Sequence, residues 1–222
     1  MSRRAAEKLI EQGAVEVNGR VATLGQSADP DTDTIMIEGN PLVKPDQRVY
    51  IMLNKPPGYV TTMSDEHGRK TVAELISDVG ARVFPVGRLD MYSEGLLLMT
   101  NDGETAQRLT HPSHMVEKTY LVRAAGTEFK RAADVLSGKM EIDGRELMPA
   151  RVKLMSESGG SAMFMISIHE GRNRQIRKML EAAGLRAVKL KRISVGEIKL
   201  GSLPMGKWRE LTAEEKKYLL HI

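Results

Sequence analysis

The spacing of apolar residues predicts a short helix at the start of this chain. Over residues 2–12 the apolar positions recur at helical spacing, so Leu9 and Ile10 face inward. The opposite side of this predicted helix is basic and carries Arg3, Arg4 and Lys8. A basic outer face of this kind is suited to an anionic partner.

Short alternating segments follow the helix and predict strands over residues 15–17, 21–22 and 34–38. Asn18-Gly19 stands between the first two, and this pair favours a two-residue hairpin turn. Residues 39–46 then combine glycine, asparagine and two prolines, which end regular structure. We therefore expect a small domain over residues 1–44 and a larger one over residues 45–222.

The larger domain mixes strands and helices without regular alternation. Its predicted strands cover residues 48–54, 118–124, 150–155, 162–169, 188–193, 197–200 and 208–211. Its predicted helices cover residues 71–79, 104–109, 173–183 and 213–220. The bulky apolar run at 162–169 favours a strand that is buried on both faces. This irregular order predicts an α+β fold rather than a doubly wound parallel sheet.

Composition narrows the class of protein. Hydrophobic residues make up 41% of the 222 residues and charged residues 28%, as in an ordinary globular protein. The absence of cysteine excludes disulfides, thiolate nucleophiles and cysteine metal sites. No apolar run approaches the roughly 20 residues that span a bilayer, and no signal-peptide pattern opens the chain. We expect a cytoplasmic protein without a membrane partner.

The net charge of +4 is unevenly distributed. Between Glu170 and Arg192 the chain has eight basic residues against two acidic ones, Glu170 and Glu181. Such a segment is suited to a polyanion, because each neutralised phosphate releases counterions. A solvated helix face is the alternative interpretation of a basic run.

Asp90 is the carboxylate whose position invites a chemical interpretation. It lies between Arg88 and the apolar run 95–99, where a surface loop or a helix cap would also explain an acid. If Asp90 converges with Tyr120 and Arg177, the arginine can keep the carboxylate ionised through a bidentate pair. Tyr120 would then offer a stacking face to a planar base. Such a pocket would accept an aromatic heterocycle carried on a phosphate chain.

The sequence contains no pattern for a metal or nucleotide cofactor. The five histidines are scattered, and neither a phosphate-binding loop nor a dinucleotide fingerprint occurs. We therefore predict neither a metal nor a cofactor.

Five segments resemble one enzyme family in its motif order. They are LNKPPGYVTT at 53–62, GRLDMYSEGLLLMTNDG at 87–103, HPSHMVEKTYLV at 111–122, EGRNRQIRKML at 170–180 and LKRISVGEIKLGSLPMGKWREL at 190–211. Together they resemble the pseudouridine synthases that modify single uridines in bacterial ribosomal RNA. The resemblance implies that family's mixed, mainly antiparallel sheet in the catalytic domain.

The opening segment, SRRAAEKLIEQGAVEVNGRVA, is similar to the small RNA-binding module first known from ribosomal small-subunit protein four. That module usually has a further helix before this segment. The resemblance therefore predicts a truncated module, with Arg3, Arg4 and Lys8 as its RNA contacts.

The resemblance implies an isomerase that breaks the N-glycosidic bond of a flipped uridine and rejoins the base through C5. Asp90 matches the catalytic aspartate, which acts either as a covalent nucleophile or in deprotonating a glycal-like intermediate. Tyr120 matches the stacking tyrosine and Arg177 the partner of the aspartate. The residues expected to bind substrate are Arg88, Lys118, Arg172, Arg174, Leu190 and Lys191.

Several alternatives stay open at this level. The expected partner is ribosomal RNA or a pre-ribosomal particle, with a large-subunit target favoured over a small-subunit one, and the chain is expected to be a monomer. A non-catalytic RNA-binding or assembly factor would keep the basic segments but lose Asp90, Tyr120 or Arg177, and all three are present. A metal-dependent phosphoryl-transfer enzyme would use the carboxylates near Asp90 and would be sensitive to chelators.

Overall fold

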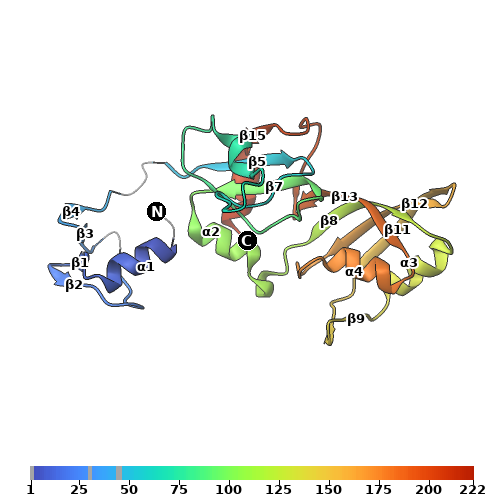
Figure 1. The fold of residues 1–222 in the computed structure, drawn as a ribbon, viewed down its shortest axis with the longest axis horizontal. Helices are drawn as coiled ribbons and strands as arrows, with labels where there is room; N and C mark the ends of the chain where they lie inside the picture. Colours follow the sequence, from blue (N-terminus) through green and yellow to red (C-terminus); the bar gives the residue numbers. More distant parts are fainter. Residues whose placement is uncertain (1–2, 30–31, 44–46) are drawn as a thin grey trace. The chain divides into compact units, whose positions relative to one another are not determined.

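The structure is a computed structural model that describes residues 3–29, 32–43 and 47–222, with the side chain of Arg3 also outside the description. The chain divides into two compact units, Met1–Gln47 and Arg48–Ile222 (Figure 1). The boundary expected between residues 44 and 45 lies outside the described residues, and the two units divide after Gln47.

The first unit pairs one helix with a small sheet. Its elements are α1 (Arg3–Glu11), β1 (Val15–Val17), β2 (Arg20–Val21), β3 (Ile35–Ile37) and β4 (Asn40–Pro41). The strand order is β2-β1-β3-β4. Asn18 and Gly19 both have positive φ angles, 53° and 75°, which confirms the predicted hairpin turn. Residues 40–41, which we predicted to belong to a linker, instead extend this sheet as β4.

The second unit is built on a nine-stranded sheet. Its main strands, in spatial order, are β11 (Arg151–Ser158), β12 (Ser161–Ile168), β8 (Lys118–Ala125), β13 (Arg186–Val195), β7 (Glu94–Thr100), β5 (Tyr50–Lys55) and β15 (Trp208–Glu210). Two short strands, β6 (Phe84–Pro85) and β14 (Ile198–Lys199), pair with β7 and β13. Of the pairs, β13 with β7 is parallel and the others are antiparallel. The predicted α+β fold with a mainly antiparallel sheet is confirmed.

Strands β5 and β7 lie at the centre of their half of the sheet and are buried on both faces. In β7, Leu97 and Met99 belong to one apolar cluster, while Leu96 and Leu98 belong to another on the opposite face. The second cluster is covered by α2 (Gly103–Thr110) and α5 (Ala213–Leu220). This double burial explains why the sequence of β7 is continuously apolar.

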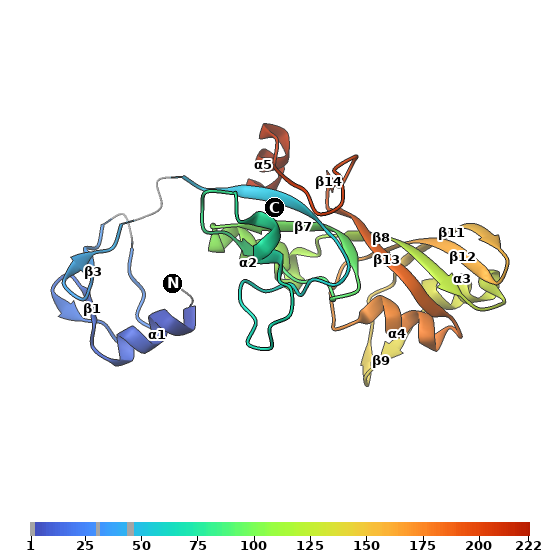
Figure 2. The same cartoon turned by 45° about the horizontal axis from the view of Figure 1, so that its top comes forward.

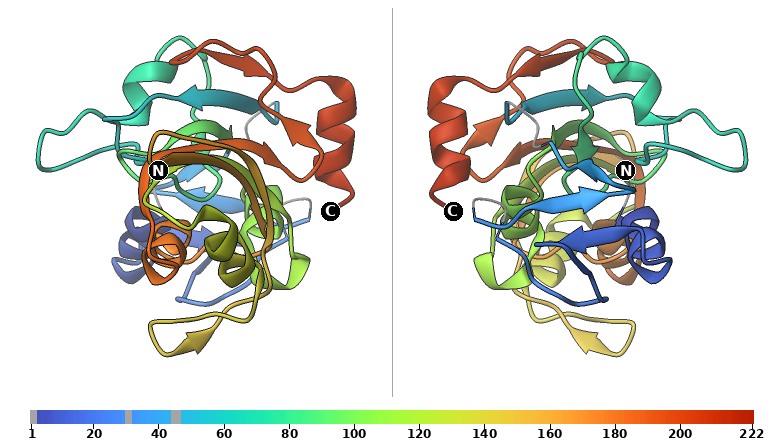
Figure 3. Two further views of the ribbon diagram at one scale, coloured as in Figure 1. Left: turned by 90° about the vertical axis from the view of Figure 1, so that its right-hand side faces the viewer. Right: turned by 90° about the vertical axis from the view of Figure 1, so that its left-hand side faces the viewer.

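The other half of the sheet packs on α3 (Phe129–Ser137) and α4 (Gln175–Ala182). Figures 1 and 2 show both helices on the same face of β8, β12 and β13, and Figure 3 shows the strands curving around them. Strand β12 alternates, with Phe164 and Ile166 buried and Met163 and Met165 partly exposed. The prediction that this strand is buried on both faces is therefore wrong, because only one of its faces is covered by helices.

Some local elements differ from the prediction. The segment predicted as a helix over 71–79 forms a single 3-10 helix, η1 (Val72–Ile76), and a second one, η2 (Pro112–His114), follows α2. Helix α3 and the hairpin of β9 (Glu141–Ile142) and β10 (Arg145–Glu146) were not predicted. Two-residue strands leave almost no periodic pattern in a sequence, so the hairpin was invisible.

Gly95 joins the two halves of the sheet at the parallel pair. It has a φ angle of 103° and lies opposite Arg192. A Cβ atom at this position would lie 2.2 Å from the backbone oxygen of Arg192. Glycine therefore permits an approach of β7 to β13 that no other residue allows.

We expect Gly95→Ala to lower the free energy of unfolding by about 3 kcal/mol or more, because it combines a backbone clash with an unfavourable φ angle. Urea denaturation followed by the fluorescence of the single tryptophan, Trp208, measures this. Gly103→Ala is the matched control, because its Cβ would meet open space and its φ is ordinary. A loss at Gly95 as small as that at Gly103 would contradict the proposed close packing.

Candidate active site

A cavity of about 490 Å³ lies where the two halves of the second unit meet. One wall comes from the loop before β7 and includes Arg88, Leu89 and Asp90. The other comes from β8 and β13 and includes Tyr120 and Leu190. Residues that are 100 positions apart in sequence thus line the same cavity.

The loop that carries Asp90 is held by a buried lysine. Lys55, at the end of β5, is fully buried, and its Nζ donates hydrogen bonds to the backbone oxygens of Asp90, Met91 and Ser93 at 3.1, 3.2 and 2.9 Å. Burial lowers the pKa of Lys55 to about 8, although the nearby charge of Asp90 opposes this shift. These contacts fix the backbone from Asp90 to Ser93, which is a requirement for a preorganised site.

A second anchor holds the loop just before Asp90. The hydroxyl of Thr61 donates to the backbone oxygen of Leu89 at 2.7 Å and accepts from its N–H at 3.2 Å. Leu89 itself is buried. Asp90 therefore directly follows a residue, Leu89, whose side chain is buried and whose backbone is held by hydrogen bonds.

Asp90 and Arg177 converge as the sequence predicted, but in a looser geometry. Arg177 Nε lies 3.5 Å from Asp90 Oδ2, with the arginine side chain 12% exposed and the aspartate 32% exposed. Arg177 Nη2 also lies 3.4 Å from Ser93 Oγ. The contact with Asp90 is a single one, not the expected bidentate pair. Arg177 Nε is buried and has no hydrogen bond within the described residues. Its N–H is therefore an unused hydrogen-bond donor beside the carboxylate.

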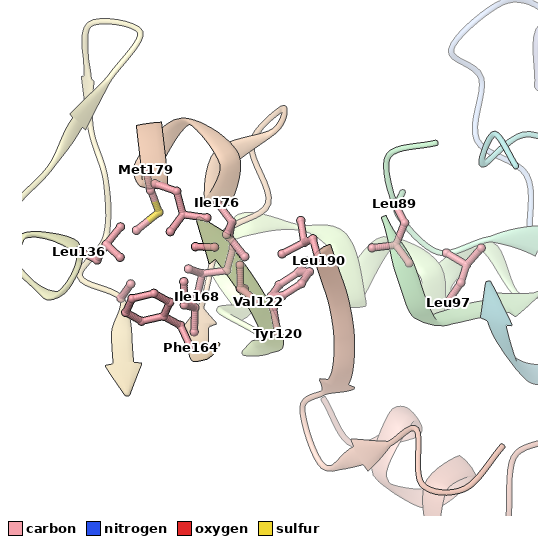
Figure 4. Close-up of a cluster of buried hydrophobic side chains, with 14 of the residues drawn as sticks. Leu89, Leu97, Tyr120, Val122, Leu136, Phe164, Ile168, Ile176, Met179 and Leu190 are labelled. Atoms are coloured by element: carbon pink, nitrogen blue, oxygen red, sulfur yellow. The ribbon is translucent and has the colours of Figure 1, made fainter. Parts of the chain in front are cut away.

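Tyr120 and Leu190 form the apolar part of the cavity wall. They lie on the adjacent strands β8 and β13, and both are buried, at 7% and 6% exposure. Figure 4 shows their side chains together with Leu89 and Ile176 in one apolar cluster. An aromatic ring beside an aliphatic side chain provides surfaces on which a planar base can pack.

The basic run of the sequence does not form one solvated face. Lys178 and Lys189 are ion-paired, and Arg192 is buried. Arg172 and Arg174 are exposed and line the cavity just before α4. The positive charge available to a ligand thus concentrates at the cavity and its rim.

Glu170 fixes the segment that carries these two arginines. Its carboxylate accepts from the N–H of Met148 at 3.1 Å and from Gln175 Nε2 at 2.9 Å. It also lies 2.9 Å from Arg172 Nε. The turn before α4 is therefore tied to the chain that follows β10.

The structure brings most of the predicted site residues to this cavity, but not all of them. Arg88, Lys118, Arg172 and Arg174 line it together with Asp90, Tyr120 and Leu190. Lys191 does not, because successive residues of β13 face opposite sides of the sheet. In the first unit Arg4 and Lys8 are exposed on α1, and the side chain of Arg3 lies outside the described residues.

Sequence reasoning missed Lys55, Thr61 and Arg192. Lys55 had a visible signal, since a lysine follows directly on an apolar strand and precedes two prolines. Arg192 was counted only as part of the basic run, yet it is 4% exposed and lines the cavity. Its Nε donates to the backbone oxygen of Leu96 at 2.7 Å.

Among the described residues, no group of three or more histidine, cysteine, aspartate or glutamate side chains is arranged to hold a metal ion. None of the described helices is long and apolar enough to cross a membrane.

Comparison with known proteins assigns the chain to a family. Residues 49–182 match the family described as RNA pseudouridylate synthase, and residues 2–32 match the S4 domain. A protein of Aquifex aeolicus (strain VF5) named an uncharacterized RNA pseudouridine synthase is 43% identical over 216 residues, covering 96% of this chain and 86% of that protein. The ribosomal large subunit pseudouridine synthase B of Bacillus subtilis (strain 168) is 40% identical, covering 98% and 90%.

A solved structure agrees with these relatives. A crystal structure of a pseudouridylate synthase matches with a TM-score of 0.70 and 31% identity, covering 99% of this chain and 94% of the other. The resemblance found in the sequence is thereby confirmed. The chain belongs to the RNA pseudouridylate synthase family, and it is a pseudouridine synthase, an isomerase, with an S4 domain over residues 2–32.

Proposed function

We propose that this enzyme converts a uridine of large-subunit ribosomal RNA to pseudouridine, with Asp90 as its catalytic carboxylate. The observation that carries the proposal is the Asp90–Arg177 contact beside a cavity walled by Tyr120 and Leu190. The choice of RNA rests on relatives from Bacillus subtilis and Vibrio cholerae, both named ribosomal large subunit pseudouridine synthase B.

The reaction moves one bond and leaves the oxidation state of the base unchanged. The N1–C1′ bond breaks, the base turns and a C5–C1′ bond forms. The hydrogen on C5 leaves as a proton and N1 takes up a proton, so the product is an isomer of uridine. The Asp90 carboxylate either attacks C1′ or takes a proton from the sugar to give a glycal-like intermediate. Both roles need a carboxylate oxygen, and Asp90 Oδ2 lies 3.5 Å from the Arg177 Nε beside the cavity.

The cavity must also retain the base while it is detached from the sugar. Tyr120 and Leu190 supply packing surfaces for this interval, and the walls limit the entry of water. Extraction of a uridine from its stack costs a few kcal/mol. Arg88, which is exposed at the rim, is placed to contact the displaced nucleotide or its neighbours.

We expect Asp90→Asn to abolish pseudouridine formation while RNA affinity and stability stay close to wild type, because the change removes charge and little volume. Tritium release from C5-labelled uridine in a ribosomal RNA transcript measures turnover. Asp134→Asn, an exposed change on α3, is the matched control. Turnover by Asp90→Asn comparable to that of the control would remove Asp90 from the mechanism.

A second prediction concerns the rim of the cavity. Replacing Arg172 and Arg174 with alanine should weaken binding to a folded ribosomal RNA fragment more than it slows single turnover of bound RNA. The reason is that both side chains are exposed, where we expect them to contact phosphates of the RNA and not the reacting uridine. Free UMP should react slowly or not at all, because it lacks the neighbouring nucleotides and their phosphates. Equal reactivity of UMP and folded RNA would show that the rim contributes nothing to specificity.

A third prediction concerns the S4 domain. Arg4 and Lys8 are exposed on α1, so replacing both with alanine should reduce the slope of log affinity against log salt by about two units. Replacing Lys130 and Arg131, exposed on α3, with alanine removes the same charge from the second unit and is the matched control. Equal slopes for the wild type and the α1 variant would mean that this face of α1 does not contact RNA.

A further inference from the structure

Two cations inside the cavity have no carboxylate partner among the described residues. Arg192 is buried, and Lys118 is half-buried on the neighbouring strand. Lys118 Nζ has one hydrogen bond, to the backbone oxygen of Val116 at 2.8 Å. Arg192 uses its Nε for the oxygen of Leu96, and its Nη nitrogens have no hydrogen bond or ion pair within the described residues. Positive charge taken out of water without a counter-charge is costly.

The register of the strands places these cations beside the apolar wall. Lys118 and Tyr120 are two residues apart on β8, and Leu190 and Arg192 are two residues apart on β13, so each pair shares a face of its strand. All four residues line the cavity. The separation within each pair is about 6.6 Å along the strand, which is comparable to the span from a base to its own phosphate in a nucleotide.

The carboxylates that line the same cavity are already engaged. Asp90 faces Arg177, and Glu170 is held by Arg172 and Gln175. The remaining cations of the lining, Arg88, Arg145, Arg172 and Arg174, are all exposed. Lys118 and Arg192 are therefore distinct from the rim, because they are sheltered and lack a protein anion.

We propose that Lys118 and Arg192 form an internal anion subsite that accepts a backbone phosphate next to the uridine held between Tyr120 and Leu190. This inference rests on the proposed function for its RNA ligand, but the anion subsite itself is a property of the cavity. A phosphate bound there supplies the missing counter-charge. Its oxygens accept hydrogen bonds from the unused N–H groups of both side chains.

Two properties of the cavity support this assignment. Burial and the charge of Arg192 lower the pKa of Lys118 to about 8, so an anion at this place stabilises the protonated lysine. The two groups are also more sheltered than Arg172 and Arg174, which are exposed. In the proposed arrangement Lys118 and Arg192 contact a phosphate that has entered the cavity, whereas Arg172 and Arg174 contact the RNA at the rim.

The test couples a protein change to a change in the RNA. A ribosomal RNA fragment that the wild type converts is prepared with an uncharged methylphosphonate in place of the phosphate on either side of the target uridine. For one of the two positions, the replacement should slow single turnover by the wild type about tenfold or more. Lys118→Met should already convert the unmodified RNA slowly, and the methylphosphonate should slow its single turnover little further. Lys118→Arg should retain the sensitivity to the replacement.

Lys153→Met, an exposed change on β11, is the matched control for loss of one charge and should respond to the methylphosphonate as the wild type does. The proposal is overturned if the methylphosphonate slows Lys118→Met as much as it slows the wild type. It is also overturned if the methylphosphonate slows the wild type at neither position.

A second measurement does not depend on turnover. Inorganic phosphate, titrated calorimetrically into the wild type and into Lys118→Met, should bind the wild type at least about tenfold more tightly. Equal binding by the two proteins would overturn the subsite. If the wild type binds phosphate in this way but converts no ribosomal RNA, the proposed function fails while the anion subsite stands. If it converts RNA but neither test distinguishes Lys118→Met, the subsite fails alone.

Discussion

The close approach of β7 to β13 at Gly95 is the constraint on which the rest of the second unit depends. The two halves of the sheet meet there in a parallel contact of two residue pairs, within an otherwise antiparallel sheet. The loop with Asp90 enters β7 just before this contact. On β13, Leu190 directly precedes the contact and Arg192 is part of it. A shift at the contact would therefore separate the carboxylate from the wall that faces it.

Two largely buried cations, Lys55 and Arg177, hold the Asp90 loop in place. Lys55 donates to three backbone oxygens of the Asp90 loop, and Arg177 approaches the carboxylate itself. Neither side chain needs substrate to be in place. The cost of orienting Asp90 is therefore met during folding and not by the binding of a ligand.

Exposed and sheltered positive charges occupy different parts of the cavity. Arg172 and Arg174 lie at the rim and can attract a phosphate backbone from solution. Lys118 and Arg192 lie inside, where an ionic contact is stronger but is reached only by a group that has entered the cavity. The same basic run of the sequence thus supplies the exposed arginines of the rim, the partner of Asp90 and a buried cation of the cavity wall.

The sequence by itself determined the hairpin at Asn18-Gly19, the apolar stripe of α4 and the α+β class, because turn chemistry and periodicity act locally. Its motifs also identified Asp90, Tyr120 and Arg177 together. Only the tertiary structure decided that Arg192, not Lys191, faces the cavity, since one residue along a strand reverses the side and periodicity does not say which side is occupied. It also decided the role of Lys55, whose partners are backbone oxygens 35 to 38 residues away that leave no pattern in side-chain identity.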